Sequence, residues 1–249
     1  MSVYSKFHKS IASYYTSLQE QYSAKYLREA FIAVLLLACF GGGYFLNKFY
    51  VQYREQQAFV ALSEVVDSFM QSQRQAQSLE PQKDKEKIIQ AWQDTQMLLD
   101  ALHKEHISSY LAPYFLVFKS QIVLERDKNL DEAIKILDDA LVSISRHTEL
   151  GSLYHMKRIK MGFDSKNPEV KERALKDLIN ISQHPKEYAY QEASYMLGVY
   201  YISMGDHAKA LQVFQALVDT SDAKALLKSP WVLLSQEKLG LVDQLTDAK

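Results

Sequence analysis

Helix-breaking residues are scarce in this chain, and their scarcity restricts its fold more than any other feature of the sequence. Only eight glycines and five prolines occur in 249 residues, and three of the glycines are consecutive at positions 41–43. A β-rich fold needs a turn about every ten residues, and turns draw on glycine and proline. Apolar residues make up 47% of the chain, which is enough for a packed core. The sequence therefore predicts an all-α fold with long helices.

Charge and cysteine content narrow the class of protein further. The net charge is −1, and acidic and basic residues are mixed along the chain. A nucleic-acid-binding surface needs a basic stripe, so we expect no nucleic-acid partner. The single cysteine, Cys39, excludes an intrachain disulfide. An exported domain without other cysteines and a cytosolic domain are both compatible with that count.

One segment, Ala30 to Leu46 (AFIAVLLLACFGGGYFL), contains no charged or amide residue. Roughly 17–25 such residues cross a bilayer, and tyrosines flank the segment as they do at membrane interfaces. The sequence thus predicts a single transmembrane helix over residues 30–50. Lysine and arginine are more frequent before the segment than in the twenty residues after it (Lys6, Lys9, Lys25 and Arg28 against Lys48 and Arg54). This bias predicts a cytoplasmic N-terminus and a C-terminal domain across the inner membrane, in the periplasm if the cell is bacterial.

Two alternatives to a permanent span concern processing: cleavage of a secretory signal, which the long leader disfavours, and lipidation of Cys39. Residues 1–29 are expected to form an amphipathic cytoplasmic tail, because apolar residues recur there at helical spacing (Phe7, Ile11, Tyr14, Leu18, Tyr22 and Tyr26). The stretch from Leu36 to Cys39 resembles a bacterial lipobox, in which Cys39 would carry a lipid. The long leader and the apolar sequence beyond Cys39 disfavour that interpretation. Ala38 and Gly42 also form a small-xxx-small pair, which would let two spans approach closely.

Beyond the apolar segment the sequence predicts a series of helices. Residues 53–104 are expected to form an opening helix pair, with a polar break around 78–84. Asn167-Pro168 and Ser229-Pro230 each combine an N-cap residue with proline at the first helical position. Those two dipeptides therefore mark helix beginnings.

The most specific pattern runs from Ser194 to Leu217 (SYMLGVYYISMGDHAKALQVFQAL). Small residues at Gly198 and Ala210 are expected where the two helices of a pair touch, and Gly205 is expected in the turn between them. With Leu197, Tyr201 and Phe214 these residues resemble a tetratricopeptide repeat. The resemblance implies an α-solenoid of antiparallel helix pairs.

Two weaker copies precede this repeat. Val117–Ala140 places Ser120-Gln121 at the Leu-Gly positions and Ala133 opposite, and Leu153–Ile181 places Gly162 opposite Ala174. The alanines at 133, 174 and 210 are 41 and 36 residues apart, against about 34 in the family. Residues 105–249 are thus expected to form degenerate repeats, and Pro230–Leu239 a C-terminal capping helix. The layout resembles the YfgM-type membrane-anchored proteins, which implies an ancillary role at the Sec translocon beside periplasmic chaperones.

No motif in the chain indicates catalysis. It has no HExxH, CxxC, GxSxG or Walker-type sequence, so we expect no enzyme, no metal and no cofactor. His103 and His106 lie one helical turn apart, and the expected role of this pair is a solvated helix end.

Binding of other proteins is therefore the expected function. The resemblance implies a concave groove lined by the first helix of each pair. The positions expected in that groove are Phe115, Phe118, Ile122, Glu125, Met156, Ile159, Phe163, Glu192, Tyr195, Val199 and Ile202. Packing of these same residues inside the domain is an equally supported interpretation.

The leading hypothesis is a membrane-tethered adaptor or chaperone-like subunit in protein translocation or envelope assembly. Its expected partners are translocon subunits, chaperones or exported chains. A self-associating membrane scaffold, a homo-oligomer joined through Ala38 and Gly42, is the first alternative. The others are a lipidated assembly factor and an organellar import receptor facing the cytosol.

Overall fold

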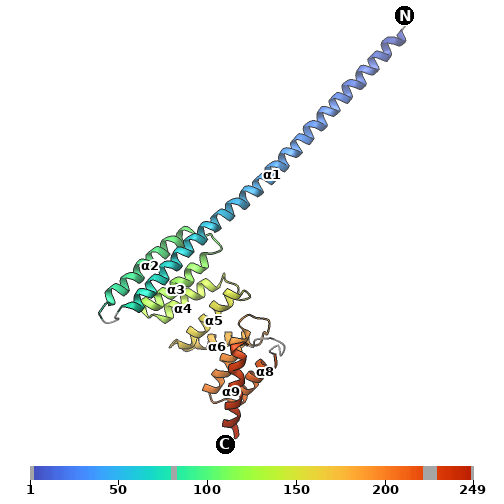
Figure 1. The fold of residues 1–249 in the computed structure, drawn as a ribbon. Coiled ribbons are helices and arrows are strands. Elements are labelled where there is room, and N and C mark those ends of the chain that lie inside the picture. The colour runs from blue at the N-terminus through green and yellow to red at the C-terminus, as the bar shows by residue number, and fades with distance from the viewer. Residues whose placement is uncertain (1–2, 80–82, 221–228, 248–249) are drawn as a thin grey trace. The chain divides into compact units, whose positions relative to one another are not determined.

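The computed structural model describes the backbone of residues 3–79, 83–220 and 229–247. It describes side chains at 16–17, 26, 29, 32, 42–79, 83–220 and 229–240. All regular secondary structure in these residues is α-helical, which confirms the predicted all-α class. The helices are α1 (Val3–Ser78), α2 (Lys85–Glu105), α3 (Ala112–Asp127), α4 (Leu130–Leu141), α5 (Glu149–Asp164), α6 (Pro168–Ser182), α7 (Tyr190–Ser203), α8 (His207–Thr220) and α9 (Pro230–Asp247) (Figure 1).

The chain divides into two compact units, residues 1–57 and 58–249. In the first unit, six apolar side chains of α1 are between 55% and 73% exposed (Tyr44, Phe45, Leu46, Phe49, Tyr50 and Tyr53). Within the described part of the chain, no helix is both long enough and apolar enough to cross a membrane. About half of the side chains of the predicted span over residues 30–50 lie outside that part, including Ala38 and Cys39. Most of the predicted amphipathic face of residues 1–29 lies outside it as well.

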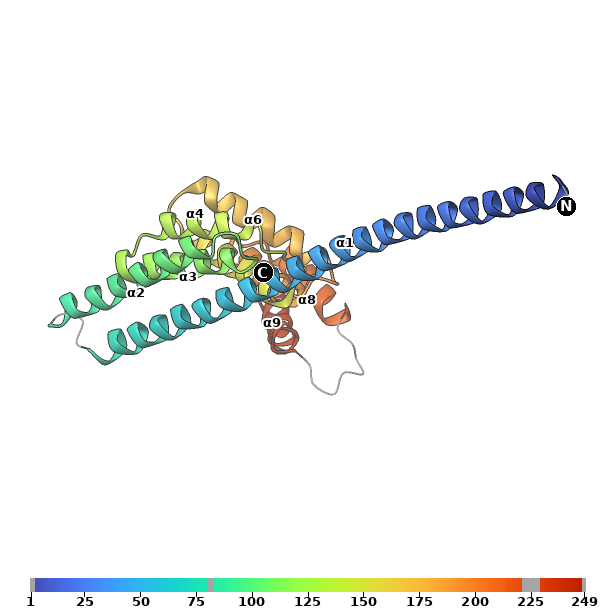
Figure 2. The same ribbon diagram turned by 90° about the horizontal axis from the view of Figure 1, so that it is seen from above.

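In the second unit, the end of α1 packs along α2 (Figures 1 and 2). The Thr95 hydroxyl lies 2.9 Å from the Ser68 hydroxyl and 2.8 Å from the Ser72 hydroxyl. The Phe69 ring lies 5.3 Å from the Trp92 ring. Residues 58–78 and α2 therefore form the opening helix pair, with a small hydrogen-bonded cluster between them.

The remaining helices follow one another in space in their chain order, each packed on the next (Figure 1). The core is built in steps that share helices. One cluster joins α1, α2 and α3, the next joins α3, α4 and α5, a third joins α5, α6 and α7, and a fourth joins α7, α8 and α9. Each helix pair in the described residues thus buries its apolar face against its neighbours in the chain.

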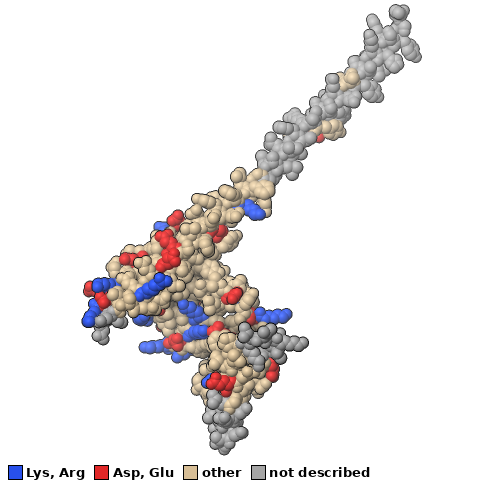
Figure 3. Space-filling view, viewed as in Figure 1, with Lys and Arg blue, Asp and Glu red and all other residues tan. Residues whose placement is uncertain are grey.

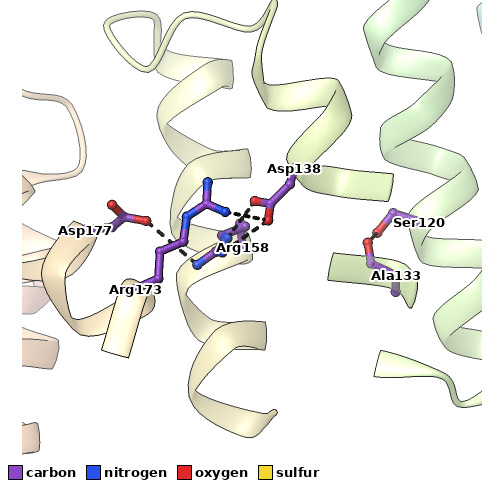
Figure 4. A network of polar contacts seen from close by, with 6 residues as sticks. All are labelled: Ser120, Ala133, Asp138, Arg158, Arg173 and Asp177. Carbon is purple, nitrogen blue, oxygen red and sulfur yellow. Dashed lines mark hydrogen bonds and ion pairs between the residues drawn. The ribbon is translucent and has the colours of Figure 1, made fainter. Parts of the chain in front are cut away.

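Small residues bring the two helices of each pair together. A Cβ atom at Gly198 would lie 2.4 Å from the ring of Phe214, and one at Gly162 would lie 2.7 Å from the Ala174 Cβ. In the α3–α4 pair the buried Ser120 hydroxyl donates to the Ala133 carbonyl at 2.6 Å (Figure 4). The close approach at Gly198 confirms that prediction. In α3 the small residue is Ser120, whereas the residue aligned with Gly198 is Gln121, one position later.

Helix ends follow the predicted capping chemistry. The Asn167 side chain accepts from the Glu169 N–H at 2.9 Å, and α6 begins at Pro168. α9 begins at Pro230, one residue after Ser229. Gly205 has a φ of +75° in the α7–α8 turn, where a left-handed conformation favours glycine. Lys128 occupies a similar conformation, with a φ of 52°, in the α3–α4 turn.

Candidate protein-binding site

The groove residues expected on α3 divide between core and surface. Phe115 and Ile122 are fully buried, each at 0% exposure, in the cluster between α1, α2 and α3. Phe118 is half-buried, and its ring lies 5.6 Å from that of Phe69. Glu125 is exposed. Of these four positions, Glu125 is the most accessible to a partner.

The residues expected on α5 are also directed inward. Met156 and Ile159 are each 1% exposed and belong to the cluster that α5 shares with α6 and α7. Phe163 is half-buried, with its ring 5.8 Å from the Tyr200 ring.

On α7 the expected positions are more accessible. Val199 is 39% exposed, and Ile202 and Glu192 are partly exposed. Tyr195 is also partly exposed, and its ring lies 5.5 Å from that of Trp231 on α9. A surface of mixed character therefore remains along α7.

Aromatic pairs join the first helix of each pair to the first helix of the next. Three of these contacts are Phe69–Phe118, Phe163–Tyr200 and Tyr195–Trp231. In the fourth, the Tyr114 ring of α3 lies 6.1 Å from the Tyr154 ring of α5. The four contacts run from α1 to α3, α5, α7 and α9 in succession. Each such pair contributes about 0.5–1.5 kcal/mol beyond the area it buries. Phe118, Phe163 and Tyr195 thus hold adjacent helix pairs together, a role that the repeat pattern alone does not distinguish from ligand contact.

An open hollow lies where α5 and α7 begin, and we call it the α5–α7 hollow. Its volume is about 500 Å³, and its wall is formed by Glu149, Leu150, Ser152, Leu153, Tyr188, Ala189 and Glu192. Leu150, Leu153 and Tyr188 are 46%, 57% and 65% exposed, although all three are large apolar or aromatic side chains. Glu192 is the one member that the repeat pattern predicted. The others lie at the start of α5 and in the α6–α7 turn, and the repeat pattern assigns none of them to the groove.

The charged groups of the α5–α7 hollow are both acidic. Glu149 and Glu192 line it, and no Lys or Arg does. The Glu192 carboxylate accepts a hydrogen bond from Lys160 Nζ at 2.5 Å, which ties α7 to α5. Acidic and basic side chains are otherwise interspersed over the face of the molecule in Figure 3. An apolar wall flanked by carboxylates is suited to an apolar side chain that has a basic neighbour.

Lys157 lies on the same helix as Lys160 and is more deeply placed. Burial lowers its pKa below the ordinary value, and the nearby Glu125 carboxylate opposes that shift. The carboxylate of α3 and the amine of α5 therefore interact electrostatically between successive helix pairs.

His103 lies in α2, and His106 lies in the turn after it. The two do not form a solvated helix end, so that prediction is wrong. His106 is buried, and its ring stacks on that of Phe115 at 6.5 Å. His103 lies 6.0 Å from the same ring. Burial, followed by the charge of Lys119, lowers the pKa of His103, and Asp100 opposes the shift. In the residues described, no three His, Cys, Asp or Glu side chains converge to hold a metal ion.

The described residues thus form helix pairs joined by aromatic contacts, and an open hollow with apolar side chains and two carboxylates on its wall. The chain matches no protein-family model, no curated protein and no solved structure.

Proposed function

We propose that this chain is a membrane-tethered adaptor that binds segments of other proteins through a tetratricopeptide-like array of helix pairs. The observation that carries the proposal is the α5–α7 hollow, in which Leu150, Leu153 and Tyr188 expose apolar surface between two carboxylates. Exposed apolar patches with a polar rim are typical of protein-binding surfaces.

The helix pairs support the repeat part of this proposal. Gly198 faces the Phe214 ring and Gly162 faces the Ala174 Cβ, so both glycines lie where two helices of one pair touch. The turn glycine, Gly205, has the left-handed conformation that the repeat requires.

The chemistry of the hollow suggests the kind of segment that binds. The partner segment inserts an apolar side chain against Leu153 and Tyr188. A lysine or arginine beside it pairs with Glu149 or with Glu192, in the latter case in competition with Lys160. Exported chains carry such apolar segments with basic neighbours. This agrees with a role in translocation or envelope assembly.

The tether is supported by the exposed apolar side chains of α1 between Tyr44 and Tyr53. Such side chains are stable in lipid and costly in water. Tethering raises the effective concentration of the hollow near membrane partners. The anchored chain is expected to resist alkaline extraction from membranes, and Leu37→Arg, within residues 30–50, is expected to release it.

A membrane scaffold that self-associates is a second candidate, favoured by a specific observation. Four residues of the expected groove (Phe115, Ile122, Met156 and Ile159) are core residues, and three aromatic ones pack on neighbouring helices. In this alternative the array supports assembly between copies, and no foreign segment enters it.

Peptide binding distinguishes the two candidates. The full-length chain in mild detergent is titrated with a labelled peptide that places one lysine beside a short run of leucines, and then with the same peptide carrying glutamate. The adaptor hypothesis predicts that the glutamate peptide binds at least tenfold more weakly, which is a loss of about 1.4 kcal/mol in binding free energy. Leu153→Asp is expected to abolish binding, whereas Leu233→Asp, at an exposed position of α9, is expected to leave it unchanged. Equal binding of both peptides, or loss of binding in neither variant, contradicts a site at the hollow.

A further inference from the structure

A second cavity lies between α4, α5 and α6, and basic side chains dominate its polar wall. Its volume is about 250 Å³. The charged and polar residues that line it are Asp138, Arg146, His155, Arg158, Arg173 and Asp177, and the rest of the wall is aliphatic. We call it the arginine cavity. It is smaller than the pockets that hold drug-sized ligands, and it has room for a single small group.

Arg158 lines this cavity and lies between Asp138 and Asp177 in a network of polar contacts (Figure 4). Its side chain is 4% exposed, and its Nε and Nη2 donate to the two carboxylate oxygens of Asp138 at 2.8 and 3.2 Å. Its remaining nitrogen, Nη1, is buried and has no hydrogen-bond partner among the residues that the structure describes. The Asp177 carboxylate is 3.8 Å from Nη1, which is an ion-pair distance but too long for a hydrogen bond. A buried guanidinium donor is therefore left to be satisfied.

The other basic groups are only partly engaged. Arg173 Nη1 donates to Asp138 at 3.2 Å, and the side chain of Arg173 is 62% exposed. Arg146 pairs with Glu187 at 3.3 Å. His155 uses Nε2 toward the Ile144 carbonyl at 3.1 Å. A guanidinium carries five N–H donors, and the contact of Arg173 with Asp138 uses one of them.

We propose that the arginine cavity binds one oxyanion, a carboxylate or phosphate group, that accepts from Arg158 Nη1 and from Arg173. Planar guanidinium groups recognise carboxylate and phosphate oxygens with paired hydrogen bonds. Glu187, from outside the lining, offsets Arg146. The two remaining arginines, Arg158 and Arg173, share a single close carboxylate, Asp138, and the Asp177 carboxylate lies 3.8 Å from Arg158. The anion replaces the long contact of Asp177 with a direct hydrogen bond. This site is separate from the α5–α7 hollow, so its test is independent of the proposed function.

The experiment measures anion binding by thermal unfolding of the full-length chain. Inorganic phosphate is titrated against sodium chloride at equal ionic strength. The expected result is a saturable rise in the unfolding midpoint with phosphate that chloride does not reproduce. Arg173→Gln is expected to weaken the apparent affinity at least tenfold. Asp177→Asn is expected to strengthen it, because it removes the competing negative charge. Arg74→Gln, on the exposed face of α1, is the matched control and leaves the response unchanged.

A second arm identifies the source of the anion. A short neutral peptide with one glutamate is tested as a competitor of phosphate, beside the same peptide with glutamine. Competition by the glutamate peptide alone assigns the site to an acidic side chain of a protein. Phosphate binding without such competition assigns it to a free anion. Equal effects of phosphate and chloride, or an undiminished response in Arg173→Gln, overturn the proposal.

Discussion

Gly162 and Ala174 provide the sharpest test of the helix-pair geometry. A methyl group added at Gly162 would lie 2.7 Å from the Ala174 Cβ, and also 3.4 Å from the Val170 carbonyl oxygen of the facing helix. Carbon atoms in contact normally lie about 3.5–4.0 Å apart. Ala174 is fully buried, and its Cβ is fixed to the backbone of α6. The clash can therefore be relieved only by moving α5 away from α6.

The expected free-energy change is a balance of two effects. Overpacking of a core costs about 1–3 kcal/mol. Alanine is favoured over glycine inside a helix by about 0.8–1.0 kcal/mol. Gly162→Ala is thus expected to lower the free energy of unfolding by about 1 kcal/mol, or roughly 2–4 °C in the thermal midpoint. The same substitution at Gly240 in α9, where an added Cβ meets nothing within 4 Å, is expected to raise it by a similar amount.

Urea denaturation followed by far-ultraviolet circular dichroism measures both variants. The double variant Gly162→Ala/Ala174→Gly restores the space for a methyl group between the helices. Its coupling energy is expected to be about 1–3 kcal/mol in the favourable direction. If Gly162→Ala stabilises the chain as much as Gly240→Ala does, or if the double variant shows no coupling, the close approach of α5 and α6 is refuted.

Three further predictions concern the turns, the aromatic contacts and pH. Gly205→Ala is expected to cost about 1–2 kcal/mol by denaturation, because the φ of +75° is strained for any residue with a Cβ, although the site is sterically open; an unchanged midpoint contradicts that conformation. Tyr195→Leu is expected to cost about 1 kcal/mol and to shift the fluorescence of Trp231, whose ring lies 5.5 Å away; unchanged emission would argue against the contact. Burial lowers the pKa of His103 in the folded chain, so the unfolded chain binds more protons. The free energy of unfolding is therefore expected to fall as pH drops below 6.5, the ordinary pKa of histidine. A decline of the same slope in His103→Gln would show that this histidine is not its cause.

Much of the helical layout could be predicted from local signals. Proline with an N-cap residue marks the start of α6 and of α9, and Gly205 marks the turn between α7 and α8. Small residues at Gly162 and Gly198 mark the places where helices touch. Each of these signals depends on the backbone geometry of a few neighbouring residues, so the sequence is sufficient to read them.

The candidate site could be predicted only in part. Periodicity shows that Phe115 and Met156 share a helix face with accessible positions, but it does not show which neighbouring helix covers them. Both are buried by contacts with other helix pairs, which are long-range in sequence. Tyr188 and Leu153 become a surface only when the α6–α7 turn meets the start of α5. Likewise, Arg158 reads as a charged residue on a helix, and its burial follows from the packing of α4 and α6 around it.

Site-specific crosslinking in native membranes tests the central claim, that the α5–α7 hollow binds other proteins. A photoreactive residue is placed at Tyr188 in the hollow and, as a control, at Met204 in the α7–α8 turn, which is equally exposed at 66% against 65%. The adaptor account predicts that a distinct partner, identified by mass spectrometry, is captured from Tyr188, not from Met204, and is lost when Leu153→Asp is added. Capture of only a second copy of this chain, or the same products from both positions, would contradict it.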